Sequence, residues 1–226
     1  MCGRFSLTQD EAAINSRFET SGSEAPYIPR FNAAPGQKQA VITNRKTDSI
    51  SYLKWGLVPF WAKAPSIGNK MINAKAETLH EKASFKHPFR KKRCLVISDG
   101  FFEWKKTAGG KIPHYIFLKN HELFAFAGLW ESWKDAEGQI LDTFTIITTE
   151  PNSLMKDIHN RMPVILHRDE EQTWLQSDNT NELKKMLTPF EADKMELYPV
   201  SSLVNSPRND SPEIIQPASG ETGSLF

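Results

Sequence analysis

The stretch CLVISDGFFEWKKTAGGKIPHYIFLKNHELFAFAGLW, residues 94–130, contains three short apolar runs that are separated by turn residues. The runs are Cys94–Ser98, Tyr115–Leu118 and Leu123–Trp130, and the Ala-Gly-Gly-Lys segment at 108–111 has the composition of a hairpin turn. Short runs rich in β-branched and aromatic residues, bounded by Gly, Pro, Asn or Asp, are typical of strands. This part of the chain therefore predicts antiparallel β-sheet.

Runs of the same kind occur on both sides of this stretch. We expect strands at Ala40–Thr43, Ser51–Val58, Phe144–Thr148 and Met195–Val200, with a second hairpin turn at 135–138. Residues 21–35 are rich in Gly, Ser and Pro and predict an extended loop. No repeat or internal linker divides the chain. The pattern predicts one α+β domain with a curved, barrel-like antiparallel β core and peripheral helices.

Helix signals occur in four places. The segment Thr8-Gln9-Asp10-Glu11 has the T-x-x-E form of a capping box, so we expect a helix from there to about Glu19. Glu150-Pro151 places a proline in the first turn of a second helix, which we expect to end near His159. Two shorter helices are expected at Asp169–Gln176 and Asn181–Leu187.

The composition is that of a globular protein, since 39% of the 226 residues are hydrophobic and 24% are charged. No run approaches the roughly 18 apolar residues of a membrane span, and the start of the chain lacks the apolar region of a signal peptide. Two cysteines, Cys2 and Cys94, fit a reducing compartment. We therefore expect a cytoplasmic protein with no membrane partner. The domain is expected to span residues 1–217, with residues 218–226 as a flexible C-terminal tail.

Charge and ligand spacing predict little about partners. The net charge of +1 does not by itself indicate a nucleic-acid partner, so such a partner must be argued from local basic positions. The six histidines and two cysteines lack the spacing of zinc sites, so neither a metal nor a cofactor is expected.

Cys2 directly follows Met1, which a methionine aminopeptidase can remove because the next side chain is small. The product would carry an α-amine and a thiol on one residue. Reference pKa values of about 7.7–8.0 for the amine and about 8.5 for the thiol leave both partly nucleophilic near neutral pH. The amine can condense with an aldehyde to an imine, and the thiol can then close a thiazolidine ring. A cysteine at this position can equally be a chance residue at a frayed terminus.

Polar groups alternate in Ile72–Thr78. If this segment is extended, Asn73, Lys75 and Glu77 share one face, by the two-residue period of strands. An amide, a cation and a carboxylate on one face could bind a sugar-phosphate group, or they could form a solvated strand face.

Two other segments contain acid–base groups. In Ser98–Trp104, Glu103 lies among three aromatic residues, and a carboxyl that is partly desolvated in this way has a raised pKa. In Asp157–Pro163, His159 is suited to proton transfer near neutral pH, and Arg161 offers a forked phosphate contact. The alternatives are a surface glutamate beside core aromatics and a structural histidine.

The segment Trp55–Trp61 combines turn residues with large aromatics. An exposed aromatic can stack on or wedge between bases, at about 1–3 kcal/mol per stacked base. Core packing is the commoner fate of tryptophan, and we expect it for Trp55.

Taken together and in this order, these segments closely resemble the SRAP (SOS response-associated peptidase) family, whose bacterial and eukaryotic members protect abasic sites in single-stranded DNA. The family pattern combines a Met-Cys-Gly-Arg start with W-G-L-[IV]-P-x-W, I-N-A-R-x-E-T, D-[GS]-[FWY]-[FY]-E-W and H-[DN]-R-M-P. The matching segments are Met1–Arg4, Trp55–Trp61, Ile72–Thr78, Asp99–Trp104 and His159–Pro163.

The resemblance implies a compact domain with a positive groove and a covalent thiazolidine crosslink between the protein and the aldehyde of an abasic site. Cys2 would be the nucleophile, first through its amine and then through its thiol. Asn73 would position the amine, Glu103 would shuttle protons, and His159 would help to open the deoxyribose ring.

The resemblance also implies how DNA is held. Arg4, Lys75 and Arg161 would contact phosphates, and Trp61 would wedge against a base. The implied partner is single-stranded DNA containing abasic sites, bound by a monomer that is nucleoid-associated when on DNA. Such binding would shield the lesion during the SOS response.

Two positions depart from the family pattern. Lys75 stands where Arg is usual, which replaces a bidentate phosphate clamp by a point charge and is expected to weaken positioning. Asn160 stands where Asp is commoner, which removes a negative charge beside His159 and is expected to lower its pKa.

Two other functions stay open at this point. Cys2, Glu103 and His159 could form a thiol peptidase site whose substrate is the protein's own Met1. Alternatively, the same groove could bind single-stranded DNA or a modified base without covalent attachment. A covalent band on a denaturing gel with abasic single-stranded DNA separates capture from mere binding.

Overall fold

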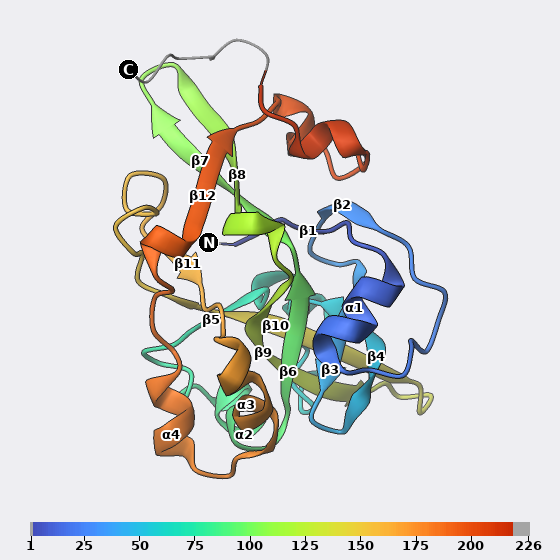
Figure 1. Cartoon of the computed structure of the whole chain (residues 1–226). Helices are drawn as coiled ribbons and strands as arrows, with labels where there is room; N and C mark the ends of the chain where they lie inside the picture. The colour runs from blue at the N-terminus through green and yellow to red at the C-terminus, as the bar shows by residue number, and fades with distance from the viewer. Residues whose placement is uncertain (1, 219–226) are drawn as a thin grey trace.

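The computed structural model describes residues 2–218, and two β-sheets form its framework (Figure 1). The strands of that range are β1 (Phe5–Leu7), β2 (Arg30–Ala33), β3 (Lys38–Thr43), β4 (Lys46–Trp55), β5 (Asn73–Lys75), β6 (Arg93–Ser98), β7 (Gly100–Thr107), β8 (Gly110–Leu118), β9 (Phe124–Lys134), β10 (Ile140–Thr149), β11 (Met162–Pro163) and β12 (Met195–Pro199). The α-helices are α1 (Glu11–Phe18), α2 (Ala83–Lys91), α3 (Glu171–Gln176) and α4 (Thr180–Lys185).

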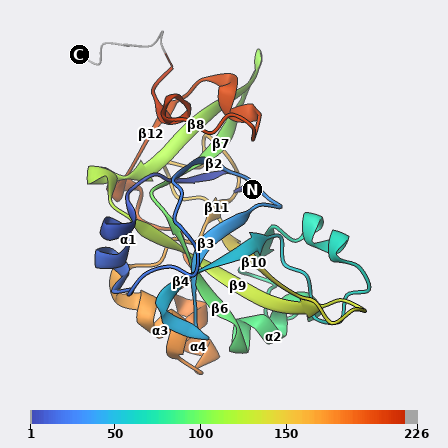
Figure 2. The ribbon, with the colours of Figure 1, turned by 90° about the vertical axis from the view of Figure 1, so that its right-hand side faces the viewer.

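The larger sheet closes on itself. Its strands pair in the order β10-β4-β3-β6-β9, and β9 pairs again with β10, which completes a five-stranded barrel (Figure 2). The expected barrel-like α+β domain is confirmed. Two pairings depart from the antiparallel pattern, because β10 runs parallel to β4 within the barrel and also to the short strand β5. Parallel neighbours need a long crossover, and here the chain between β4 and β10 builds β5 to β9 first.

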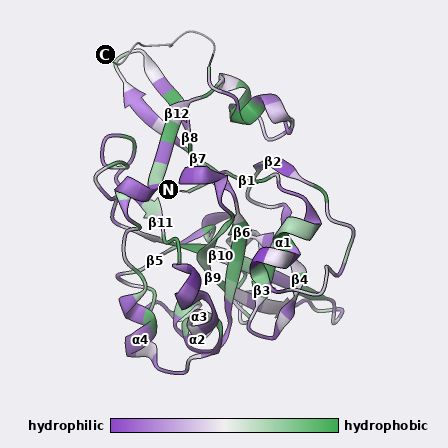
Figure 3. Ribbon diagram, viewed as in Figure 1, coloured by the Kyte–Doolittle hydropathy of each residue, from purple (hydrophilic) through white to green (hydrophobic). Residues whose placement is uncertain are grey.

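The second sheet, in the order β12-β8-β7-β1-β2, covers one side of the barrel. Alternate residues of the barrel strands pack on opposite faces, as the two-residue period of strands requires. One face, with Ile42 and Leu95, packs against α1 to α4, whereas Val41 and Val96 pack in a cluster with Phe5 and Phe101 of the second sheet. Hydrophobic residues accordingly gather on the central strands, and the tip of the β7–β8 hairpin is hydrophilic (Figure 3).

The first helix forms where expected, but its cap differs. The N-cap of α1 is Asp10, whose side chain accepts a hydrogen bond from the Ala13 backbone N–H at 2.8 Å. Thr8 was predicted to be the cap. Its hydroxyl instead donates to Asp99 Oδ2 at 2.7 Å, because the buried Asp99 carboxylate needs donors from this segment.

The helix predicted between Glu150 and His159 is wrong. Residues 153–158 form turns, with single bonds such as Lys156 N–H to the Asn152 carbonyl at 3.0 Å. The Asn152 side chain caps Met155 N–H at 2.9 Å and donates to the Phe190 carbonyl at 2.7 Å. The first bond has the form of an N-cap, but the turns end where the N–H groups of Ile158 and His159 both donate to the Met155 carbonyl oxygen, so no regular helix follows. The two later helices are confirmed as α3 and α4.

Several short elements were not predicted. β1, β2, β5, β7 and α2 lie in stretches for which no strand or helix was expected, and β2 lies inside the expected loop at 21–35. The strand expected to reach Val58 ends at Trp55, because Gly56 turns the chain with φ 125° and a Cβ there would lie 2.7 Å from the Gly68 carbonyl oxygen. Of the expected tail, residues 219–226 lie outside the described residues. In the described range, no helix is long and apolar enough to cross a membrane.

Candidate active site around Cys2

Cys2 lies in the cluster between the two sheets, packed with Phe5, Trp55 and Phe101, and its side chain is fully buried. The Sγ atom is 3.8 Å from the Arg4 carbonyl oxygen, a weak hydrogen bond. Burial raises the pKa of the Cys2 thiol well above its usual range, and the negative charge of Glu103 raises this pKa further. The thiol is therefore protonated in this state, and no thiolate is preformed.

Asn73 binds the backbone of Cys2. Its strand, β5, pairs parallel to β10 with Asn73 opposite Ile146. From there, Asn73 Nδ2 donates to the Cys2 carbonyl oxygen at 2.8 Å. The Asn73 Oδ1 atom is buried and accepts no hydrogen bond from any described residue. The amide thus holds Cys2 and presents an acceptor next to it.

Glu103 lies on β7, on the same side of the sheet as Phe101, and is only 2% exposed. The pairing of β1 with β7 continues towards the N-terminus through the Phe102 N–H bond to the Arg4 carbonyl oxygen at 3.0 Å, which brings this part of β7 alongside the Cys2 segment. Burial raises the pKa of the Glu103 carboxyl, as its aromatic surroundings predicted. A carboxyl with a raised pKa is suited to act as a general acid or base.

His159 follows the turns at 153–158 and is half-buried. Its Nδ1 accepts a hydrogen bond from Arg161 N–H at 3.0 Å, so the neutral ring carries its proton on Nε2. Burial is the main cause that lowers the pKa of His159, and the positive charges of Lys106 and Lys111 act in the same direction. The ring is therefore neutral at pH 7, with an Nε2–H donor.

Arg161 is held by a carboxylate. Its guanidinium makes a forked contact with Glu77 at 2.6 and 3.0 Å and donates to the Thr148 carbonyl oxygen. Lys75 is exposed and pairs with Thr148 across the strands, which brings it to the same position of β10 as Arg161.

Glu77 was expected to share a strand face with Asn73 and Lys75, but β5 ends at Lys75 and Glu77 lies in a turn. The role of Glu77 was missed because its partner is 84 residues away in sequence.

Arg4 has mostly internal partners. Its Nη1 donates to Asn32 Oδ1 at 2.9 Å and to the Val204 carbonyl oxygen at 2.8 Å, and its Nη2 lies 3.5 Å from the Asn205 carbonyl oxygen. The guanidinium therefore joins the N-terminal segment to residues 204–205. A phosphate contact by Arg4 would have to share these donors.

The two tryptophans of the segment Trp55–Trp61 have different environments. Trp55 is buried, stacks on Phe144 and donates from Nε1 to the Ile72 carbonyl oxygen at 2.9 Å, which confirms its core role. Trp61 is 49% exposed and neighbours the exposed Phe60. Its loop, which leads to the Asn73 strand, is therefore able to offer an aromatic surface.

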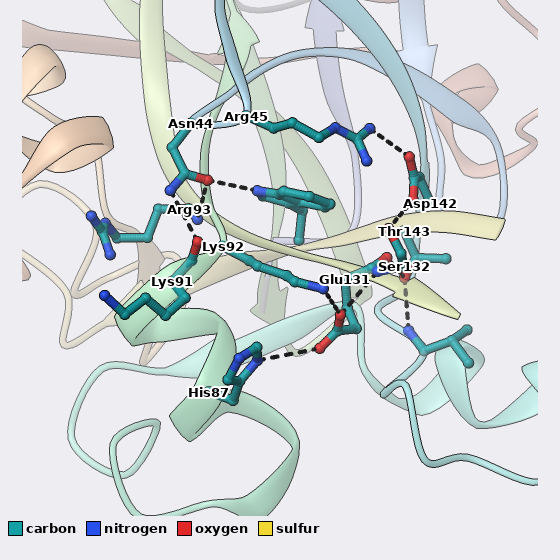
Figure 4. A network of polar contacts seen from close by, with 12 residues as sticks. Asn44, Arg45, His87, Lys91, Lys92, Arg93, Glu131, Ser132, Asp142 and Thr143 are labelled. Atoms are coloured by element: carbon teal, nitrogen blue, oxygen red, sulfur yellow. Dashed lines mark hydrogen bonds and ion pairs between the residues drawn. The ribbon is translucent and has the colours of Figure 1, made fainter. Parts of the chain in front are cut away.

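A buried polar network braces this loop (Figure 4). Thr143 accepts from Val58 N–H at 2.9 Å and donates to the Glu131 carbonyl oxygen at 3.2 Å. The Glu131 carboxylate is buried and pairs with Lys92, while His87 lies 3.7 Å from it. No local pattern in the sequence identified this network, because its members come from separate strands and helix α2.

The chain thus combines a closed β-barrel with an N-terminal cysteine that is buried beside the amide of Asn73. The strand of Asn73 pairs with β10, where Lys75 and Arg161 meet at Thr148, and Arg161 N–H binds His159. The chain belongs to the SRAP family, since the family model described as SOS response associated peptidase (SRAP) matches residues 1–207.

Individual relatives agree with this assignment. The chain is 50% identical to the abasic site processing protein YoqW of Bacillus subtilis, over 96% of this chain and 99% of the relative. It is 35% identical to the abasic site processing protein HMCES of Gallus gallus, over 86% of this chain and 68% of the relative. A crystal structure of a protein from Bacteroides thetaiotaomicron superposes with a TM-score of 0.88 and 33% identity, covering 96% of this chain and all (100%) of the other. The chain is therefore a member of an abasic-site-processing family.

Proposed function

We propose that this protein captures abasic sites in single-stranded DNA by forming a thiazolidine crosslink through Cys2. The observation that carries the proposal is the arrangement at Cys2: Asn73 binds its carbonyl oxygen at 2.8 Å, and the buried Glu103 lies on the face of β7 that packs in the Cys2 cluster through Phe101. Two relatives are named abasic site processing proteins, which supports abasic-site DNA as the substrate.

The reaction begins once Met1 has been removed. The Cys2 amine adds to the open-chain aldehyde carbon, and loss of water from the carbinolamine gives the imine. The thiol sulfur then bonds to the imine carbon while its proton moves to the nitrogen, which closes the ring. Asn73 Oδ1 accepts a hydrogen bond from the amine, and Glu103 takes the amine proton and returns it to the departing hydroxyl. His159 donates from Nε2–H to the deoxyribose ring oxygen during ring opening.

DNA is held by cations and an aromatic side chain. Lys75 and Arg161, together at Thr148, contact phosphates that flank the lesion, and Arg4 adds a third contact. Trp61 wedges against a base, which an intact partner strand would obstruct. The protein acts as a monomer on single-stranded DNA in the cytoplasm, and the adduct shields the lesion in the SOS response.

The thiol peptidase alternative receives less support from this geometry. A cysteine peptidase needs an accessible thiolate, whereas the Cys2 thiol is buried with a raised pKa. Capture does not need a thiolate at the start, because the amine reacts first. A denaturing gel of the processed protein with abasic single-stranded DNA tests the proposal. A covalent band is expected, and its absence would contradict capture and favour the alternative function of non-covalent DNA binding.

Retention of Met1 is expected to abolish capture, because the nitrogen of Cys2 is then an amide and cannot form an imine. The comparison uses protein with an uncleaved N-terminal extension and processed protein, with the termini verified by mass spectrometry. Equal crosslink yields from the two proteins would contradict the amine's role.

Substitution of a phosphate-binding cation should change the salt dependence of DNA binding. Arg161→Ala and Lys75→Ala are each expected to reduce the slope of log K against log salt by about 0.7 on single strands. Lys91→Ala is the matched control, since Lys91 pairs with Asp178 at the C-terminal end of α2. The slopes are measured by fluorescence anisotropy with undamaged single strands, and wild-type slopes in both test variants would place these residues outside the DNA path.

A further inference from the structure

His114 is a buried histidine that lies opposite Glu103. The two residues face each other in the β7–β8 ladder, and the pair two positions away, Phe101 and Ile116, packs in the same cluster as Cys2. Residues opposite each other in antiparallel strands project to the same face, with Cβ atoms about 5 Å apart. His114 is 8% exposed. The register therefore places an imidazole beside the carboxyl on the Cys2 side of the sheet.

The hydrogen bond of the ring defines which nitrogen carries a proton. His114 Nδ1 lies 3.0 Å from the Ile112 carbonyl oxygen. A carbonyl oxygen only accepts, so Nδ1 is the donor. Nε2 is then an acceptor in the neutral ring and a donor in the cation, and it is the nitrogen that changes its protonation state.

The elements around His114 supply few charges apart from Glu103. On the other neighbouring strand, β12, the residue opposite is Pro199, and the residue two positions before it is Leu197. On β7, the next residue on the Glu103 face is Lys105. Further titratable groups on or near these elements are Cys2, His159 and, towards the hairpin tip, Lys106 and Lys111, whose charges act on His159.

We infer that His114 is a positioning residue that controls the protonation state of Glu103, so that the two side chains titrate as a coupled pair. The inference deepens the proposed function, on which it rests. A cationic His114 stabilises the Glu103 carboxylate, the form that takes the amine proton during capture. When Glu103 is protonated for release, His114 is neutral and accepts through Nε2.

Loss of His114 is expected to shift the pH dependence of capture and release in a defined direction. Burial alone raises the pKa of the Glu103 carboxyl, and a cationic neighbour opposes this effect. Without His114, the pKa of Glu103 should rise further. Capture, which needs the carboxylate, should then be lost at a higher pH than in wild-type protein, whereas release, which needs the protonated form, should become faster near pH 7.

The test uses His114→Asn, whose amide can keep the donor to the Ile112 carbonyl, and His114→Phe, which keeps the ring volume. Capture and release rates are measured from pH 5 to 8. At a pH where Glu103 is mostly protonated, a rise of about one unit in its pKa corresponds to about a tenfold slower capture, and the difference should shrink towards pH 8. His167→Asn is the control, because His167 pairs with Glu191 away from this ladder. A general structural defect would slow capture equally at every pH.

A second measurement separates this inference from the proposed function. The ¹³C chemical shift of the Glu103 carboxyl is titrated in DNA-free protein, and its midpoint is expected to rise in both His114 variants. An unchanged midpoint together with an unchanged pH profile overturns the inference, even where the wild-type protein crosslinks normally. A shifted midpoint in a protein that forms no crosslink would sustain the inference and overturn the proposed function.

Discussion

Cys2→Ala protein is expected to form no heat-stable adduct with abasic single-stranded DNA. The variant keeps an α-amine after removal of Met1, so it can still form an imine, but it has no thiol to close the thiazolidine ring. The expected change is complete loss of the band that survives heating, with at most a Schiff base that borohydride can trap. Yields are measured on denaturing gels with and without borohydride.

Cys94→Ala is the matched control for this experiment. Cys94 is the other cysteine of the chain, is fully buried on β6 and packs in the same cluster as Cys2. Its loss removes a thiol of the same burial without touching the amine. The control should crosslink at the wild-type yield, and a heat-stable adduct from Cys2→Ala protein would exclude the thiazolidine as the end product.

Glu103→Gln and His159→Ala should each slow capture by about 10²–10⁴-fold in the step that the side chain serves. Both variants keep Cys2, so the stable adduct still accumulates with time. Because burial raises the pKa of Glu103, wild-type capture should decline as pH falls through that raised value, whereas Glu103→Gln protein should lack this decline. Single-turnover rates between pH 5 and 8 measure the effect.

Release distinguishes the two side chains. Reopening the thiazolidine requires a proton on the ring, which Glu103 supplies, so Glu103→Gln adducts should persist longer in a strand-exchange chase. His159→Ala should slow capture and have a smaller effect on release, because ring opening of the deoxyribose precedes the covalent steps. Release from Glu103→Gln protein at the wild-type rate would show that another group supplies this proton.

Local sequence patterns predicted many of the strands. The apolar runs predicted the positions of β3, β4, β6, β8, β9, β10 and β12, and both hairpin turns lie between paired strands. Such patterns reflect properties of a few neighbouring residues, namely alternation and turn composition. The raised pKa of Glu103 was predictable for the same reason, since its aromatic neighbours adjoin it in sequence.

Local patterns failed where side chains had distant partners. Thr8 bonds Asp99 rather than capping a helix, and Asn152 bonds the Phe190 carbonyl where a helix was expected. The strands β1 and β2 are too short to show a pattern in the sequence, and they belong to the sheet through pairing of β1 with β7 and of β2 with β1. Tertiary contacts of this kind override intrinsic preference.

The amino-acid sequence by itself determined that the chain is a β-rich domain with a cysteine at position 2 and acid–base groups at Glu103 and His159. Only the tertiary structure decided which groups meet. It brings Asn73 to the Cys2 carbonyl and Glu77 to Arg161. The physical reason is that strand register and barrel closure depend on packing summed over the whole sheet, so contacts between residues far apart in sequence leave no signal in any short segment.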